Sequence, residues 1–195
     1  MWTKTLDEGP FWKSALAFML GLAALIFLSP IQWTTGEGIP ITIQSLLVVL
    51  IPTLIGWKRG TLAVILYLVA GGFGAPVFAY GTNGWERFTG STGGFLMAFP
   101  LAAMLSGWSM EQRVGPRSSI FAIFILLLGQ LLILALGLLW QRSIIPIEES
   151  AIDSIRRLLP GLMVKTAMGG LFIAIVQRIS EQINRRQSSP HRQQG

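Results

Sequence analysis

Residues 158–176, LLPGLMVKTAMGGLFIAIV, form an apolar run that is long enough to cross a bilayer and that carries a lysine near its middle. This run favours a helix, because in lipid each backbone amide must find its hydrogen-bond partner within its own segment. Lys165 is the one charged side chain in the interior of any such run of this chain. A charge at that depth costs about 2.5–3.5 kcal/mol on insertion scales, so it indicates a functional site.

The composition of the whole chain is that of an integral membrane protein. Of its 195 residues, 52% are hydrophobic and 12% are charged, whereas a soluble domain carries about 25% charged residues. The chain has no cysteine, which excludes disulfides and thiol chemistry. Its length leaves room for the membrane part and no second domain.

Six apolar runs predict an all-α, polytopic membrane protein with six transmembrane helices. The predicted spans are Phe11–Leu28, 41–57, 61–80, 92–108, 118–140 and 158–176, and the second, third and sixth are interrupted by Pro52, by GGFGAPVF and by PG. We expect residues 1–10 to be a cytoplasmic segment, residues 11–180 to be the six-helix domain, and the polar tail 181–195 to be cytoplasmic and disordered. The first run lacks an Ala-x-Ala cleavage site and is expected to be retained.

Basic residues in the connections predict the orientation of the chain in the cytoplasmic membrane. One side holds Lys4, Lys13, Lys58, Arg59, Arg113, Arg117, Arg178, Arg185, Arg186 and Arg192, and the other holds Arg87, Arg142, Arg156 and Arg157. Both termini are therefore expected on the cytoplasmic side. The formal charge of +6 is explained by topology rather than by nucleic-acid binding. Tryptophans at span ends, Trp12, Trp33, Trp57, Trp108 and Trp140, are typical of the aromatic belts of membrane proteins.

The residue inventory argues against an enzyme and against a metal site. The only histidine, His191, lies in the tail, and no aspartate or glutamate lies within a predicted span. The segment GLMVKT is not a phosphate-binding loop, since Leu159 and Val164 occupy the positions that such a loop needs as glycine. We therefore expect no cofactor, and no binding of ATP by this chain itself.

Lys165 has two interpretations from the residues alone. As a ligand group it would bind an anion arriving from outside, such as a carboxylate. The alternative is that its stem reaches the outer interface, but Arg157 is eight residues away, or about 12 Å along a helix. Among the weaker candidates, Thr42 and Gln44 lie near the outer end of the second span, and Gln130 is best explained by an interhelical hydrogen bond.

Two further features remain open from the residues alone. The glycine-rich segment GTNGWERFTGSTGG, residues 81–94, is either a lid that presents Asn83 to a pocket or a plain solvated loop. In the first span, Ala17 and Gly21 form a small-xxx-small pair with Ala24 close to the same face, which favours close contact with a neighbouring helix. The spacing does not decide whether that helix belongs to this chain or to a partner.

Four segments in register resemble the BioY family. They are IPITIQSLLVVL (39–50), GWKRGTLAVILYLVAGGFGAPVFA (56–79), GSTGGFLMAF (90–99) and PGLMVK (160–165), and the resemblance runs from about residue 10 to 180. The family comprises the biotin-binding S-components of energy-coupling-factor (ECF) transporters. The resemblance implies a six-helix protein that binds biotin near its outer side and docks on a transmembrane coupling subunit, which is driven by a pair of cytoplasmic ATPases.

The resemblance also implies roles for particular residues. Lys165 matches the family's binding lysine, which would face either the valerate carboxylate or the polar ring of biotin. We expect the rest of the binding site to comprise polar Asn83, Gln44 and Thr42, aromatic Tyr67, Phe78 and Phe95, and Gly94. In the family fold, the face of the first helix that carries Ala17, Gly21 and Ala24 would contact the coupling subunit.

The chain departs from the family's pattern at three positions. Leu162 stands where the family usually has aspartate, Ser91 where it often has proline, and Phe95 where it often has tyrosine. Three functions therefore stay open. They are a biotin S-component, an S-component for a related vitamin or a biotin precursor such as dethiobiotin, and a membrane partner protein that transports nothing.

Overall fold

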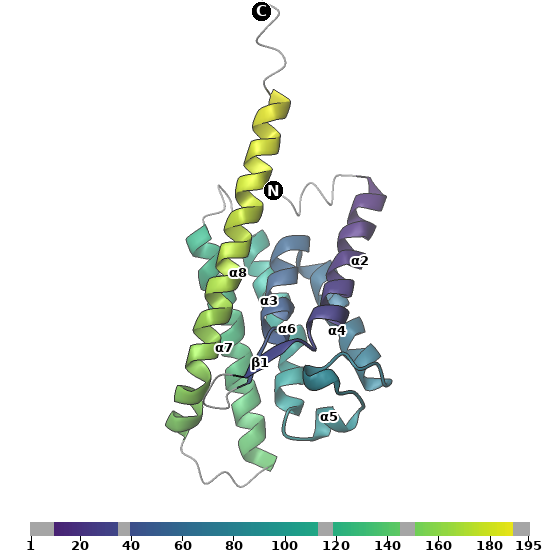
Figure 1. Ribbon diagram of the computed structural model, residues 1–195. Helices are drawn as coiled ribbons and strands as arrows, with labels where there is room; N and C mark the ends of the chain where they lie inside the picture. The colour runs from purple at the N-terminus through teal and green to yellow at the C-terminus, as the bar shows by residue number, and fades with distance from the viewer. Residues whose placement is uncertain (1–9, 35–39, 113–118, 145–150, 189–195) are drawn as a thin grey trace, which may run out of the picture.

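A computed structural model describes residues 10–34, 40–112, 119–144 and 151–188. In these parts of the chain, helices run back and forth along one axis (Figure 1). The longer ones are α2 (Phe11–Leu28), α3 (Gln44–Ile55), α4 (Trp57–Gly72), α6 (Gly93–Glu111), α7 (Ser119–Ile144) and α8 (Ala151–Ser188). The beginning of α2 and the end of α8 lie at the same end of the bundle (Figure 1). The opposite end, below, carries the shorter elements.

Those shorter elements connect the long helices. Strands β1 (Gln32–Thr34) and β2 (Pro40–Thr42) pair antiparallel, with Gln32 opposite Thr42, between α2 and α3. A 3-10 helix η1 (Ala79–Gly81) and the single-turn helix α5 (Glu86–Thr89) lie between α4 and α6. The predicted helix over 61–80 therefore ends earlier than expected, at Gly72. Gly74, with φ 104°, and Pro76 turn the chain out of α4 into the segment that holds η1 and α5.

Helix α3 forms the centre of the bundle because it is apolar on all sides. It packs against α2, α4, α6, α7 and α8, and nearly all of its side chains are buried. A helix that is hydrophobic all round belongs in a core. Pro52 interrupts neither α3 nor its register, and α8 likewise continues through Pro160. The break after α3 comes instead at Gly56, whose φ of 95° allows α4 to start at the next residue.

The outer helices expose apolar side chains rather than polar ones. Met19 on α2 is 63% exposed and Leu171 on α8 is 64% exposed. Among the helices of the described residues, four are long and apolar enough to cross a membrane, namely α2, α6, α7 and α8. In water such surfaces would drive aggregation, whereas lipid tails solvate them. The expectation of an integral membrane protein is confirmed. Each predicted span contains a helix, but residues 41–42 of the second belong to strand β2 and residues 73–80 of the third lie beyond the end of α4.

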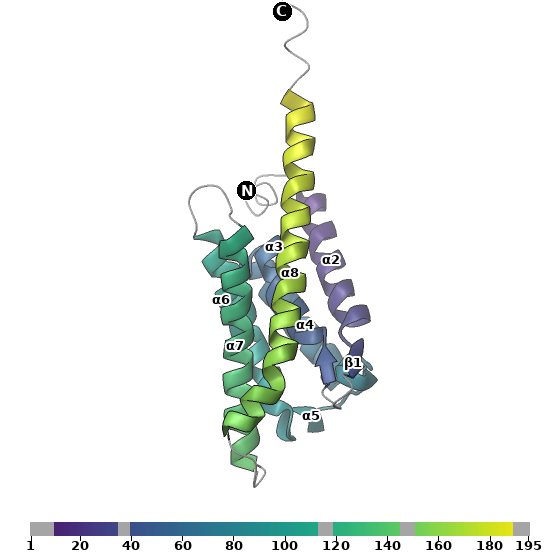
Figure 2. The same cartoon turned by 60° about the vertical axis from the view of Figure 1, so that its left-hand side comes forward.

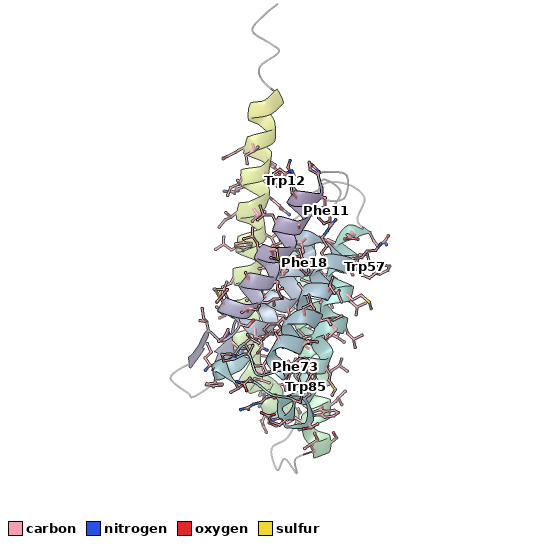
Figure 3. The ribbon with its side chains drawn as sticks, turned by 90° about the vertical axis from the view of Figure 1, so that its right-hand side faces the viewer. Phe11, Trp12, Phe18, Trp57, Phe73 and Trp85 are labelled. Atoms are coloured by element: carbon pink, nitrogen blue, oxygen red, sulfur yellow. The ribbon has the colours of Figure 1, made fainter. Side chains whose placement is uncertain are left out.

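Two pairs of exposed aromatic side chains lie near opposite ends of the bundle (Figure 3). Phe11 and Trp12 lie at the start of α2, whereas Phe73 and Trp85 lie at the opposite end. This distribution agrees with the predicted aromatic belts. Trp140 differs from a simple belt residue, because its indole Nε1 donates a hydrogen bond to the carbonyl of Gly90 at 3.0 Å.

At the C-terminus, α8 continues through Ser188 and projects beyond the other helices (Figure 2). Eight residues of the predicted disordered tail, 181–188, are therefore helical. The remainder of that tail, including His191, and most of the predicted segment 1–10 lie outside the described residues.

Candidate ligand-binding site

A cavity of about 380 Å³ opens toward the end of the bundle that carries β2, η1 and α5. Its volume lies in the range of pockets for small molecules. Its walls come from β2 and the start of α3, from the η1–α5 segment, and from the facing sides of α6, α7 and α8. The polar lining residues are Thr42, Gln44, Ser45, Tyr80, Thr82, Arg87, Thr92, Gln130 and Lys165.

The rest of the wall is apolar. Phe78, Phe95 and Phe99 present aromatic rings to it, and Leu96, Ile133, Leu134, Leu158 and Leu162 complete the surface together with Ala79 and Gly161. Phe95 reaches the cavity because it packs directly on Gly137 of α7, where an added Cβ would collide with its ring. Such a wall suits the apolar body of a ligand and leaves a few polar groups to fix its orientation.

Lys165 lines this cavity from α8 and is partly buried. Its ammonium Nζ donates a hydrogen bond to Ser45 Oγ of α3 at 3.0 Å. In the described parts of the chain, no carboxylate forms an ion pair with it. The side chain is thus held inside the protein by a neutral partner, and the alternative in which it reaches the outer interface does not describe its position.

Arg87 of α5 is the second cation at the cavity. Sequence reasoning treated it only as a topology signal, although it is the one basic residue in the segment 81–94. Among the described residues that line the cavity, none is aspartate or glutamate. Two positive charges without a lining acid favour an anionic ligand.

Gln44 is oriented by a chain of buried hydrogen bonds. Its Nε2 donates to Tyr67 Oη at 2.8 Å, and Tyr67 Oη donates to the carbonyl of Val77 at 2.9 Å. Tyr67 is fully buried and does not line the cavity. The residue that we expected to pack against the ligand therefore acts as a support for Gln44 and for the η1 segment.

We predict that Tyr67→Phe lowers both the thermal stability of the protein and its affinity for ligand. The substitution removes the donor to Val77 and the acceptor for Gln44, and unsatisfied buried groups cost about 1–3 kcal/mol each. Differential scanning fluorimetry and ligand titration check the two effects. A control, Tyr80→Phe, removes a hydroxyl from an exposed tyrosine, and its melting temperature should stay at the wild-type value. Equal stability of Tyr67→Phe and wild type would contradict the supporting role.

The structure brings together five of the predicted binding residues, Lys165, Gln44, Thr42, Phe78 and Phe95, around one cavity. It places two others beside it. Asn83 follows the lining residue Thr82 but does not itself line the cavity. Gly94 packs beneath Trp140, where an added Cβ would collide with the indole side chain.

The loop 81–94 covers part of the cavity instead of standing free in solvent. It contributes Thr82, Arg87 and Thr92 to the wall. Its base is fixed by a hydrogen bond from the amide of Gly84 to the carbonyl of Gly71 at 2.8 Å. Aromatic contacts extend this attachment, since Phe88 stacks edge-on against Phe78, which in turn contacts Tyr67. Of the two open interpretations, the covering one agrees with this packing.

The small residues of α2 line a second, apolar groove between α2, α3 and α8. Ala17, Gly21 and Ala24 all contribute to it. Gly21 faces α3 of the same chain, because a Cβ there would lie 3.0 Å from Ile51 and 3.2 Å from Ile55. The spacing left open which helix lies next to this face. For Gly21 the structure shows that it is α3 of the same chain.

Comparison with known proteins places the chain in a family. The model of the BioY family matches residues 5–185, nearly the whole chain. The chain belongs to the BioY family. The resemblance found in the four sequence segments is thereby confirmed.

Relatives of this BioY-family chain are named as transporters. It is 37% identical over 131 residues to "Biotin transporter BioY2" of Lactococcus lactis subsp. cremoris (strain MG1363), covering 67% of this chain and 70% of that one. It is 36% identical over 147 residues to "Biotin transporter BioY" of Rhodobacter capsulatus, covering 70% and 77%. Each of these two matches covers at least two thirds of this chain.

A solved structure shares the fold of this BioY-family chain. It is described as the crystal structure of the S-component for biotin from an ECF-type ABC transporter. The TM-score is 0.72 at 24% sequence identity, and the match covers 87% of this chain and 92% of the other. The S-component fold expected from the sequence is confirmed.

Proposed function

We propose that the protein is the biotin-binding subunit of an uptake system in the cytoplasmic membrane, which binds biotin from the external side. The observation that carries the proposal is the cavity, which combines an apolar, aromatic wall with Lys165 and Arg87 and no described carboxylate. Biotin has a carboxylate at one end, an apolar chain and bicycle, and a polar ureido ring. The relatives named biotin transporters support this choice of ligand.

In this proposal all six long helices cross the membrane. Helix α3 is only 12 residues long, about 18 Å at 1.5 Å per residue. This is shorter than the hydrocarbon core of about 30 Å, so part of the crossing would be made by non-helical backbone at the ends of α3. Such backbone is tolerated at membrane depth where protein covers it, and other helices surround α3. Lys58, Arg59 and Arg178 then lie on the cytoplasmic side with both termini, whereas Arg87 and the cavity face outside.

Biotin movement in this proposal depends on partners. A transmembrane coupling subunit and a pair of cytoplasmic ATPases supply the energy, since this sequence lacks a phosphate-binding loop. Support comes from the shared fold with an S-component of an ECF-type transporter. The α2 face with Ala17 and Ala24, which lie half-buried at the apolar groove, is the proposed docking surface for the coupling subunit.

Equilibrium binding of radiolabelled biotin to the detergent-purified protein tests the ligand. We expect saturable binding that unlabelled biotin displaces and that biotin amide, which lacks the negative charge, displaces poorly. Dethiobiotin and pantothenate serve as competitors from related chemistry. Displacement of labelled biotin by one of these at a lower concentration than unlabelled biotin requires would favour the S-component for another ligand. No saturable binding of biotin, dethiobiotin or pantothenate, each tested as the labelled ligand, would favour the partner protein that transports nothing.

A further inference from the structure

Gln130 lies at the cavity wall in the middle of α7 and is only 2% exposed. It faces α8, which runs beside α7 in both views (Figures 1 and 2). Its Nε2 donates a hydrogen bond to Thr166 Oγ1 at 3.1 Å. The interhelical hydrogen bond that the sequence favoured is therefore present, but it uses only one end of the amide.

The neighbouring hydrogen bond determines which end of the amide is used. The hydroxyl of Thr166 donates its single proton to the carbonyl of Leu162 at 2.9 Å. Thr166 Oγ1 must then act as an acceptor toward Gln130, so the amide nitrogen faces α8 and the oxygen faces away. No described residue donates a hydrogen bond to Gln130 Oε1.

A buried carbonyl oxygen without a donor is costly, so a donor that enters the cavity is strongly favoured there. The two cations of the wall also donate hydrogen bonds, and neither bonds to this oxygen. Oε1 is buried in the ligand-free protein, but the last torsion of a glutamine side chain is soft and Gln130 lines the cavity. Contact with a ligand therefore requires a rotation that turns Oε1 toward the cavity. A ligand carboxylate has no proton to give, whereas a ureido ring offers N–H groups.

We propose that Gln130 is a specificity-determining residue that accepts a hydrogen bond from a ureido N–H of the ligand through Oε1. The inference rests on the proposed function, because it assigns one contact within the biotin site. Thr166 positions Gln130 for this contact by holding the amide nitrogen. The polar ring of biotin then lies at the α7–α8 side of the cavity, beside Lys165.

The test compares biotin with its two cyclic carbamate analogues, in each of which one ureido N–H is replaced by a ring oxygen. Affinities are measured by displacement of radiolabelled biotin from wild type, from Gln130→Met and from Gln112→Met. Gln112 is exposed at the end of α6, so its replacement is the matched control. We expect wild type and the control to bind one analogue about tenfold more weakly than biotin, and Gln130→Met to bind that analogue and biotin almost equally.

Two outcomes overturn the inference while the proposed function stands. In the first, wild type binds biotin and both analogues with equal affinity. In the second, Gln130→Met binds all three ligands more weakly by one common factor, which is the behaviour of an interhelical hydrogen bond alone. If the methionine variant does not fold, Gln130→Asn, which withdraws the oxygen by one methylene, is judged by the same ratio. Failure of wild type to bind biotin overturns the proposed function itself.

Discussion

Lys165→Met is expected to weaken biotin binding about 10- to 100-fold while leaving the protein folded. Hydrogen bonds to charged groups contribute about 1.5–3 kcal/mol, and each 1.4 kcal/mol corresponds to about a tenfold change in affinity. The ammonium group lies at the cavity with only the neutral Ser45 as a hydrogen-bond partner. Its charge is therefore available to a polar or anionic ligand.

The same variant separates a ligand role from a structural one. Because an intramembrane charge is costly, removing it is expected to leave the melting temperature of the ligand-free protein unchanged or to raise it. Lys58→Met removes an exposed lysine of α4 that does not line the cavity and is expected to bind biotin like wild type. If Lys165→Met bound biotin with wild-type affinity, the lysine would have no role in ligand binding and its contact with Ser45 would be purely structural.

The helices of this protein follow from the sequence because the membrane leaves few alternatives. In lipid, an apolar run of about 20 residues must form its backbone hydrogen bonds within itself, and it therefore becomes a helix. Length and hydropathy are thus enough to predict α2, α6, α7 and α8. The end of α4 and the β1–β2 pair were not predictable in this way. They lie where tertiary contacts, such as Gly84 with Gly71, decide the backbone path.

The binding site was predictable only where a residue was unusual for its surroundings. Lys165 is conspicuous in an apolar run, and it lines the cavity. Arg87 is ordinary in a polar loop, and only the packing of that loop reveals its place at the cavity. Tyr67 shows the opposite case, since an aromatic residue beside the site turned out to support Gln44 from behind. Local sequence does not distinguish these roles, because they depend on which way a side chain faces.

Leu162→Asp is expected to tighten biotin binding by more than about 1 kcal/mol, the scale of a hydrogen bond to a charged group. Leu162 is 6% exposed, lines the cavity and lies three residues before Lys165, on the same face of α8. A carboxylate there can accept a hydrogen bond from the ureido ring, which Gln130 is proposed to draw to this side. Lys165 would at the same time pair with the new charge, which limits its desolvation cost.

The sign of this change reports which end of biotin Lys165 faces. If the ammonium instead binds the valerate carboxylate, an aspartate at position 162 competes with the ligand for Lys165, and the affinity falls. Leu162→Asn is the matched control, because it supplies an acceptor without a charge and should change the affinity less than aspartate does. Titration of the three proteins with labelled biotin decides between these cases. An affinity that stays at the wild-type value in Leu162→Asp would mean that this side chain does not reach the ligand, although it lines the cavity.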